Sequence, residues 1–279
     1  MTSADIFQLR AKDNSVAGRL ALVTGASGGI GSHCAIVREP WLPRAATLPF
    51  IIHPAAADAL ASELRAQYPG QLFVPCRADL SSREATRDLV PNLLQTDVVA
   101  AKHKTISILV ANAGLGRRIR DVADIEESDW DDMFEVNTRS PFVVVKSAVA
   151  GMRAQNWGRI VLVGSLASQG KGLNGCHYAA SKGALSSMGR NLANLLALEG
   201  VSPAMIASTG MIPLPKAGSW DRTAQSLDSL RNSDPGLAIA STIPVARLGT
   251  PDEVAQVTIM FAKTGYLTGQ DVHLNGGLH

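Results

Sequence analysis

Residues 24–31 read TGASGGIG and begin at the end of an apolar run, residues 20–24. A glycine-rich turn thus stands between an expected strand and an expected helix. Such a turn lets backbone amides approach a pyrophosphate, and the helix N-terminus adds a field that favours negative charge. The candidate contacts here are Gly25, Ser27, Gly29, Ile30 and Gly31. A glycine cluster alone is a weak signal, because the same residues also make ordinary turns.

Short apolar or β-branched runs alternate with longer stretches that carry apolar residues at helical spacing. The runs expected to be strands are residues 20–24, about 47–52, 72–76, 106–111, 160–164 and 272–274. The stretches expected to be helices are residues 55–68, 82–95, 128–155, 178–198 and 251–263. This alternation predicts an α/β fold, a doubly wound parallel sheet of the Rossmann type in a single domain. We place the domain at residues 16–279 and treat residues 1–15 as an N-terminal extension.

Composition excludes several classes of function. The 279 residues carry 26 Lys plus Arg against 24 Asp plus Glu, so there is no basic excess for nucleic-acid binding. No apolar, uncharged stretch is long enough to span a membrane, and the first twenty residues lack the apolar core of a signal peptide, so we expect a cytoplasmic protein. Cys34, Cys76 and Cys176 are odd in number and are expected to be reduced thiols. The histidines show no zinc-ligand spacing, so no metal site is expected.

Two segments depart from the regular pattern. Pro40 and Pro43 interrupt the expected first helix and Pro49 falls inside the second strand pattern, where proline removes a backbone donor. After residue 198 the chain passes through Glu199 and Gly200 directly to residues 201–203. This leaves too few residues for the strand that should follow, by about five. We therefore expect an irregular second βα unit and a shortened strand.

Tyr178 and Lys182 lie four residues apart in an expected helix, which places them on one face. A neighbouring ammonium favours the phenolate and lowers the pKa of a tyrosine, so the pair suits proton transfer. Ser165 follows the expected strand at residues 160–164, at the carboxyl end of the sheet where α/β proteins bind ligands. Asn112 and Asn137 lie at or near two other such positions. The alternative is a surface tyrosine beside a solvated lysine.

Several motifs together resemble the classical short-chain dehydrogenases/reductases in order and spacing, over essentially the whole chain from about Val16. They are TGASGGIG, Asp79 with Leu80, Asn112 with Ala113 and Gly114, Asn137 with Thr138, Ser165, Tyr178 with Lys182, residues 267–270 and residues 275–277. The 3-oxoacyl-carrier-protein-reductase-like branch is the most similar. The resemblance implies that Tyr178 is the proton donor in reduction, that Lys182 lowers its pKa and binds the nicotinamide ribose, and that Ser165 holds the substrate oxygen. Asn137 would position a water that relays protons through Lys182.

The same resemblance assigns cofactor contacts outside the glycine turn. Asp79 and Leu80 would meet the adenine, and Asn112, Ala113 and Gly114 would line the adenosine side. The nicotinamide carboxamide would meet the segment that contains Pro203, Ile206, Ser208 and Thr209. The expected second strand ends in Ile52, His53 and Pro54 with no acid for the 2′-hydroxyl of NAD, which favours NADP(H) over NAD(H). Arg38, Arg44 and His53 are candidate partners of a 2′-phosphate.

The predicted activity is hydride transfer between a nicotinamide cofactor and a ketone or secondary alcohol, with a 3-oxoacyl thioester or a polyketide-type ketone as candidate substrates. The alternative is a catalytically impaired member that binds nucleotide without turnover. Its support is the two irregular segments. The apolar helices at residues 128–155 and 178–198, with the resemblance, predict a homo-oligomer, dimer or tetramer. Arg117, Arg118 and Arg120 either attract an acidic substrate or form a solvated loop, and His177 is either a pocket residue or a structural one.

Overall fold

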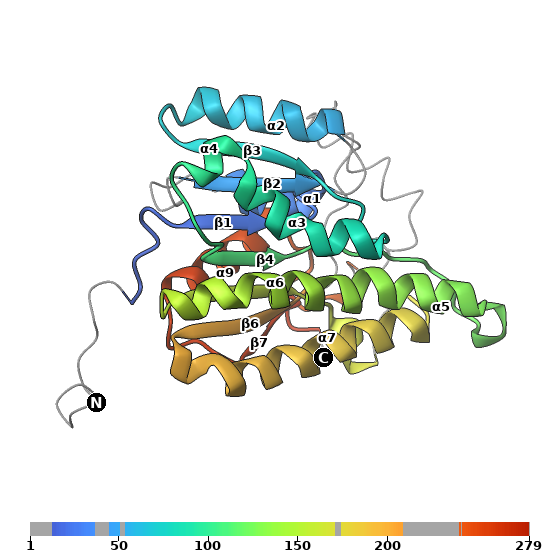
Figure 1. The fold of residues 1–279 in the computed structure, drawn as a ribbon. Coiled ribbons are helices and arrows are strands. Elements are labelled where there is room, and N and C mark those ends of the chain that lie inside the picture. The colour runs from blue at the N-terminus through green and yellow to red at the C-terminus, as the bar shows by residue number, and fades with distance from the viewer. Residues whose placement is uncertain are drawn as a thin grey trace.

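The computed structural model describes residues 13–36, 45–50, 54–170, 174–208, 240 and 242–278. They contain a seven-stranded sheet in the order β3-β2-β1-β4-β5-β6-β7 (Figure 1). Every neighbouring pair is parallel. The strand order reverses between β1 and β4, which is the doubly wound arrangement expected from the sequence.

The bounds of the elements follow the sequence pattern closely. The strands are β1 (Leu20–Val23), β2 (Ala45–Phe50), β3 (Leu72–Arg77), β4 (Ile108–Ala111), β5 (Gly158–Val163), β6 (Val201–Ser208) and β7 (Asp271–Leu274). The α-helices are α1 (Gly29–Ile36), α2 (Pro54–Gln67), α3 (Arg83–Gln95), α4 (Asp97–Ala100), α5 (Glu127–Phe134), α6 (Ser140–Ala154), α7 (Cys176–Leu196) and α9 (Pro251–Lys263). Shorter helical turns are η2 (Val122–Asp124), the π turn η3 (Glu135–Arg139), η4 (Leu166–Gln169) and η5 (Ala197–Glu199).

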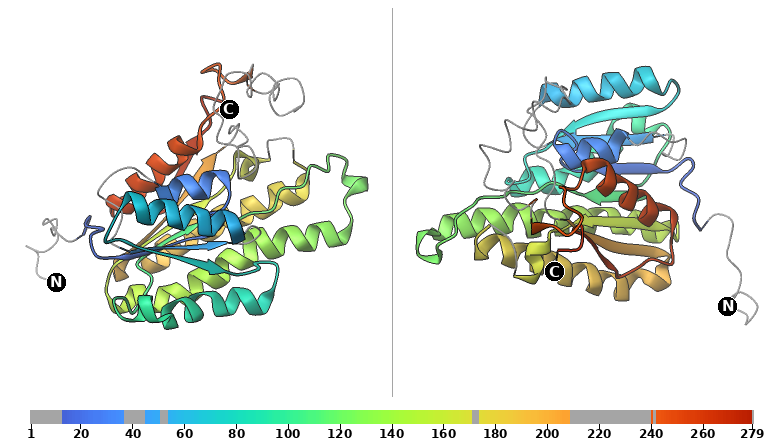
Figure 2. Two further views of the ribbon diagram at one scale, coloured as in Figure 1. Left: turned by 90° about the horizontal axis from the view of Figure 1, so that it is seen from above. Right: turned by 180° about the vertical axis from the view of Figure 1, so that it is seen from behind.

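The sheet separates two apolar core layers, because successive strand residues point to opposite faces. In β1, Ala21 and Val23 pack with α1, α2 and α9, whereas Leu20 and Leu22 pack with α3, α6 and α7. Figure 2 shows α1 and α9 on the face of the sheet opposite α6 and α7. All four β1 side chains are buried, which explains why this strand reads as a continuous apolar run. No helix in the described part of the chain is long and apolar enough to cross a membrane.

The expectation of a shortened strand after residue 198 was wrong. Helix α7 ends at Leu196, the turn η5 follows, and Gly200 reverses the chain with a left-handed φ of +76°. β6 then runs for eight residues and pairs with β5 and β7. Pro203 is tolerated because β7 pairs only from Met205 onward, so the missing N–H falls before that ladder.

The second βα unit is regular where it is described. Helix α1 spans eight residues, and β2 pairs with both β1 and β3. Pro49 lies within β2, beyond Thr47, the last β2 residue paired with β1. Pro40 and Pro43, which motivated the prediction of irregularity, lie outside the described residues. The predicted helix at residues 128–155 is found as α5, the π turn and α6 in sequence.

Candidate active site

The candidate site lies along the carboxyl edge of the sheet, where four strands end close together. Thr24 follows β1, Asn112 follows β4, Ser165 follows β5 by two residues, and Ser208 ends β6. These strands are neighbours in the sheet order or flank its point of reversal. Ligands of doubly wound folds bind at this edge, so the sequence-predicted residues meet where a ligand is expected.

The glycine turn is shaped by close backbone contacts. Gly25 has a φ of +69°, and a Cβ there would lie 2.9 Å from the Cα of Ala113. A Cβ on Gly31 would collide with the carbonyl oxygen of Gly25. Both positions therefore require glycine. Helix α1 begins at Gly29 with no acidic side chain in its first turn, so its free amides are available to an anion.

Thr24 joins the glycine turn to the turn after β4, and the sequence analysis did not single it out as a contact. Its hydroxyl accepts hydrogen bonds from the backbone amides of Asn112 (3.0 Å) and Ala113 (3.1 Å). The Asn112 side-chain amide donates back to the carbonyl oxygens of Thr24 (3.0 Å) and Gly25 (3.3 Å). Asn112 therefore builds the frame of the site with its amide group. The signal in the sequence was a hydroxyl residue between the strand and the first glycine.

The proton-transfer group is assembled on helix α7 and the end of β5. Tyr178 and Lys182 lie one turn apart, and the Lys182 Nζ is 5.9 Å from the centre of the Tyr178 ring. The Lys182 ammonium donates a hydrogen bond of 3.0 Å to the carbonyl oxygen of Val163, the last residue of β5. The Ser165 side chain is hydrogen bonded to the phenol of Tyr178. Its Oγ also accepts from the amide of Ala167 and so caps η4.

Burial controls the protonation of both groups. It raises the pKa of Tyr178, an effect that the hydrogen bond from Ser165 partly opposes. It lowers the pKa of Lys182 to about 8, because the ammonium is desolvated. The sequence analysis expected Lys182 to lower the pKa of Tyr178. In the structure, burial and the hydrogen bond with Ser165 are what shift this pKa. Tyr178 therefore holds its proton at neutral pH, as a proton donor must.

Asn137 lies fully buried in the π turn and faces Lys182 across Gly114. Its Oδ1 accepts from the amide of Leu115 at 2.7 Å, and its Nδ2 donates to the carbonyl oxygen of Leu115 at 2.9 Å and to the Ser181 Oγ at 3.1 Å. A Cβ on Gly114 would lie 3.1 Å from the Asn137 Oδ1 and 3.4 Å from the Lys182 Nζ. The structure thus brings all four predicted catalytic residues to one place. A π turn, often found at functional sites, has no simple sequence signal.

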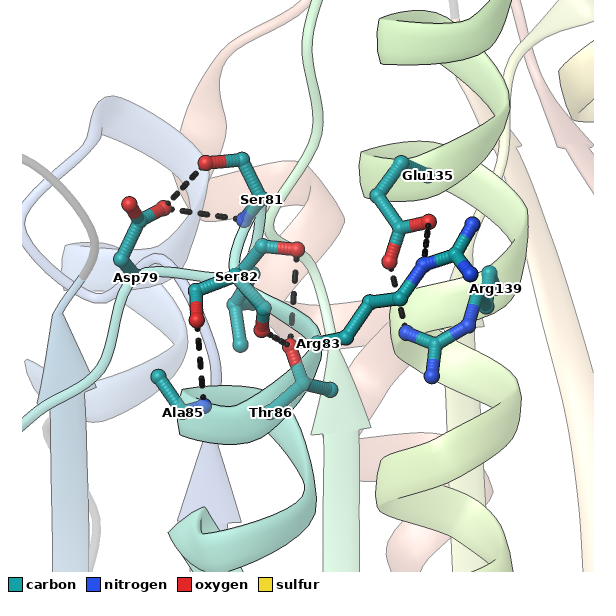
Figure 3. A network of polar contacts seen from close by, with 9 residues as sticks. Asp79, Ser81, Ser82, Arg83, Ala85, Thr86, Glu135 and Arg139 are labelled. Atoms are coloured by element: carbon teal, nitrogen blue, oxygen red, sulfur yellow. Dashed lines mark hydrogen bonds and ion pairs between the residues drawn. The ribbon is translucent and has the colours of Figure 1, made fainter.

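The predicted adenine contacts lie at the end of β3. Asp79 accepts hydrogen bonds from the amide (2.9 Å) and the hydroxyl (2.7 Å) of Ser81, through one carboxylate oxygen (Figure 3). The hydroxyl, followed by the amide, holds the pKa of Asp79 below its ordinary range. Leu80 is 3% exposed and packs in the core, so its side chain is not available to a ligand. The cofactor contact of Leu80 stays a prediction.

Two of the predicted carboxamide contacts need correction because β6 is complete. Pro203 pairs with Ile160 and lies five residues before the carboxyl end of β6, away from the site edge. Ile206 is fully buried in the core between the sheet and α9. Ser208 ends the strand at the site edge, and Thr209 lies outside the described residues.

Other candidate residues have mostly structural partners. Arg117 was expected either to attract an acidic substrate or to lie in a solvated loop. It forms ion pairs with Asp129 and, at 2.9 Å, with Asp132, so its charge is already balanced within the protein. His177 is buried, and neither ring nitrogen has a hydrogen-bond partner in the described part of the chain. The proposed partners of a 2′-phosphate, Arg38, Arg44 and His53, lie outside the described residues.

A nucleotide-binding sheet with a Ser, Tyr and Lys group at its carboxyl edge defines a class of nicotinamide-dependent enzymes, and sequence comparison gives the family. The family model for short chain dehydrogenases matches residues 19–217, which is more than half of the chain. The chain belongs to the short chain dehydrogenase family of oxidoreductases.

Individual relatives cover nearly the whole chain. The 3-oxoacyl-acyl-carrier-protein reductase FabG of Vibrio harveyi is 28% identical over 271 residues, 94% of this chain and 98% of that protein. Acetoacetyl-CoA reductase of Cupriavidus necator is 29% identical over 286 residues, 94% of this chain and 98% of that protein. A crystal structure of a candidate NAD(P)-dependent gluconate 5-dehydrogenase from Beutenbergia cavernae, with NADP bound at low occupancy, has a TM-score of 0.79 and 27% identity, covering 95% of this chain and 98% of that one.

Proposed function

We propose that the protein is an NADP(H)-dependent reductase that interconverts a ketone and a secondary alcohol. The convergence of Ser165, Tyr178, Lys182 and Asn137 at the carboxyl edge supports this most directly. The geometry of the glycine turn fits the cofactor, because Gly25 and Gly31 exclude side chains where the turn packs. The nicotinamide supplies a hydride when it is bound.

The side chains of the site divide the remaining work. Tyr178 gives its proton to the carbonyl oxygen while the carbonyl carbon gains the hydride, and a proton from solvent restores the phenol. Ser165 donates a hydrogen bond to the same oxygen and stabilises its developing negative charge. Lys182 binds the ribose through the N–H groups that Val163 does not use, and Asn137 guides the returning proton.

The relatives and the sequence together support the proposed cofactor preference and substrate class. The Beutenbergia cavernae structure carries NADP, and residues 52–54 supply no acid for the 2′-hydroxyl of NAD. FabG of Vibrio harveyi and acetoacetyl-CoA reductase are named for 3-oxoacyl and acetoacetyl thioesters. We infer a small-molecule carbonyl substrate, with 3-oxoacyl thioesters as the first class to test. Gluconate-type sugar acids are the second class, after the structural neighbour.

The alternative is a nucleotide-binding protein without turnover. One of its two supports, the shortened strand, is removed by the eight residues of β6. The other rests on residues 37–44 and 51–53, which lie outside the described part of the chain. The complete catalytic group therefore favours the enzyme.

The direct test mixes the purified protein with NADPH or NADH and follows cofactor oxidation with acetoacetyl thioesters and with simple ketones. We expect oxidation of NADPH in preference to NADH, and no oxidation by Tyr178→Phe. Tight binding of NADPH without turnover of any carbonyl would favour the silent binder instead. Faster oxidation of NADH would reverse the cofactor preference and leave the reaction unchanged.

We also propose that the protein is a cytoplasmic homo-oligomer. Phe142 on α6 is 47% exposed and lies with Phe134 and Met188 in a groove of about 650 Å³. Charged side chains, among them Arg83, Glu135 and Arg139, line the rest of this groove. A second copy is the partner that such a face favours in this family. Light scattering should return a mass at least twice 29.3 kDa, and Phe142→Asp should lower it. A monomer at micromolar concentration would contradict this proposal.

A further inference from the structure

The π turn that carries Asn137 is held by ion pairs of its own side chains, one of which reaches helix α3. A π turn adds a residue to the helical repeat and interrupts the regular hydrogen-bond ladder, so its shape depends on neighbouring contacts. Glu135 begins this turn and Arg139 ends it. Their side chains form an ion pair of 2.6 Å that spans the whole turn, with Asn137 at its midpoint.

The same carboxylate is held from outside by a second arginine. Arg83, the first residue of α3, reaches the other carboxylate oxygen of Glu135 at 3.2 Å (Figure 3). Arg83 is placed by the cap of α3, because the side chain of Ser82 accepts a hydrogen bond from the amide of Ala85. The side chain of Glu135 is 14% exposed, against 68% for Arg83. The carboxylate is thus the sheltered centre of the cluster.

The two sides of the π turn have different tasks. One side carries the Glu135 cluster, and the other carries the buried amide of Asn137 with its bonds to Leu115 and Ser181. A rotation of this turn would move both sides together, because only one residue separates Glu135 from Asn137. Loss of the carboxylate would also leave two guanidinium groups close together without the charge that attracts both.

We propose that Glu135 is a positioning residue, which clamps the π turn to α3 and thereby keeps the Asn137 amide aligned with Lys182 for proton return. The proposal rests on the proposed reductase function. It predicts that Glu135 affects the proton-transfer part of the reaction more than substrate binding. It also predicts that Glu135 acts only through Asn137.

The main test is Glu135→Gln, which keeps the shape of the side chain and removes its charge. We expect kcat to fall by about tenfold with less than a twofold change in the KM of the carbonyl. The solvent deuterium isotope effect on kcat should rise, because proton return becomes slower relative to hydride transfer. The variant Glu135→Gln/Asn137→Ala should be no slower than Asn137→Ala alone, because both substitutions remove the same contribution of the Asn137 amide to proton return.

A matched control is Glu199→Gln. Glu199 lies in the turn η5, just after the C-terminal end of α7. It forms a glutamate–arginine ion pair with Arg153 of α6, with a hydrogen bond of 2.9 Å. This control should leave kcat and the isotope effect unchanged. A kcat of Glu135→Gln within about twofold of wild type, or losses that multiply in the double variant, would overturn the proposal.

A second measurement does not depend on turnover. Hydrogen exchange of the backbone amides at residues 133–140 should be faster in Glu135→Gln than in wild type and unchanged in Glu199→Gln. Unchanged exchange in Glu135→Gln would overturn the clamp even if activity fell. If the wild-type protein reduced no carbonyl, the proposed function would fail, whereas the exchange result would still decide whether Glu135 holds the turn.

Discussion

The two edges of the parallel sheet each bury a cation, and they surround it differently. At the carboxyl edge, Lys182 is 4% exposed and donates one hydrogen bond, to the Val163 carbonyl, within the described part of the chain. At the amino edge, Arg159 is 2% exposed and donates to the carbonyl oxygens of Asp13 and Gly158. Its guanidinium also lies 4.3 Å from the centre of the Trp157 ring.

This difference separates a binding site from a structural joint. Burial lowers the pKa of Lys182 to about 8 and that of Arg159 to about 10, so both cations are costly to bury. The amino edge offsets this cost with backbone carbonyls and an aromatic face, and Trp157 itself donates to the carbonyl oxygen of Asp13 at 2.9 Å. The carboxyl edge leaves two ammonium N–H groups for a ligand. Arg159 also keeps a buried Nε–H without a partner in the described part of the chain. The two cations are therefore distinguished by their place in the sheet, since ligands of such folds bind at the carboxyl edge.

The largest expected effect comes from Tyr178→Phe. The ring and its packing stay, but the proton donor is lost, so kcat should fall by about a thousandfold or more. Binding of NADPH should change little, and fluorescence titration of the cofactor would measure it. Near-wild-type turnover would show that Tyr178 is not the proton donor. It would also contradict the placement of the active site at the carboxyl edge of the sheet.

The matched control for this variant is Tyr68→Phe. Tyr68 packs beside Phe73 with ring centres 6.4 Å apart, close to the α2 face of the core and away from the candidate site. Its hydroxyl has no part in the proposed reaction, so kcat should stay within about twofold of wild type. A large loss of kcat in Tyr68→Phe would show that a loss of kcat in Tyr178→Phe is not evidence for a role of Tyr178 in the active site.

The second prediction tests the two cations with the same substitution. Lys182→Met should abolish turnover and stabilise the fold, by as much as about 3 kcal/mol, because it removes a buried charge with few partners. Arg159→Met should instead destabilise the fold by about 1–3 kcal/mol, because it removes two hydrogen bonds to backbone carbonyls and the contact of the guanidinium with the Trp157 ring, while turnover at low temperature is kept. Denaturant unfolding and initial rates measure the two effects.

The pH dependence of Lys182→Met follows from the sign of the pKa shift. The folded chain releases this proton near pH 8, whereas the unfolded chain keeps it up to about its ordinary value of 10.5. The wild-type protein therefore gains stability from this group as the pH rises between these values. The advantage of Lys182→Met should be greatest below pH 8 and fade toward pH 10.5. A Lys182→Met protein less stable than wild type at pH 7 would contradict the comparison of the edges.

The sequence predicted the sheet and most helices because their apolar patterns match buried faces. It failed at β6, where the chain after residue 198 was expected to be about five residues too short for a strand, whereas β6 has eight residues. The strand at residues 201–208 depends on the left-handed turn at Gly200 and on pairing with β7 that starts only at Met205. A local sequence pattern contains neither feature. For the same reason, Pro203 and Ile206 were wrongly predicted to contact the nicotinamide carboxamide.

The site was predicted unevenly. Ser165, Tyr178 and Lys182 were identified from spacing and resemblance, and the structure places them together. Burial raises the pKa of Tyr178, whereas the sequence analysis expected Lys182 to lower it; burial depends on the whole fold and not on the neighbouring residue. Thr24 was missed because its partners, Asn112 and Ala113, lie more than eighty residues away. Contacts of this length depend on strand order, which the motif alone does not state.

The smallest expected effect comes from an exposed charge near the carboxyl edge. Helix α9 ends at Lys263, close to the amino edge where Gly265 bonds to Asn14, so its first turn lies toward the carboxyl edge. There Glu253 completes a capping box with Thr250 and pairs with Arg247 at 2.7 Å, and Arg247 is the main cause of its pKa falling to about 2.

Glu253→Gln tests whether burial or location gives the edge its chemistry. Because the pair is exposed and screened by solvent, the variant should lose only about 0.5–1 kcal/mol at pH 7, with kcat unchanged. The folded pKa is depressed, so this stabilisation is complete above the ordinary glutamate value of 4.5 and disappears as the pH falls toward 2. Thermal melting of both proteins between these limits should therefore converge at the acid end. A loss of kcat comparable to that of Lys182→Met would mean that exposed charges at this edge also serve the reaction, and that burial is not what sets the site apart.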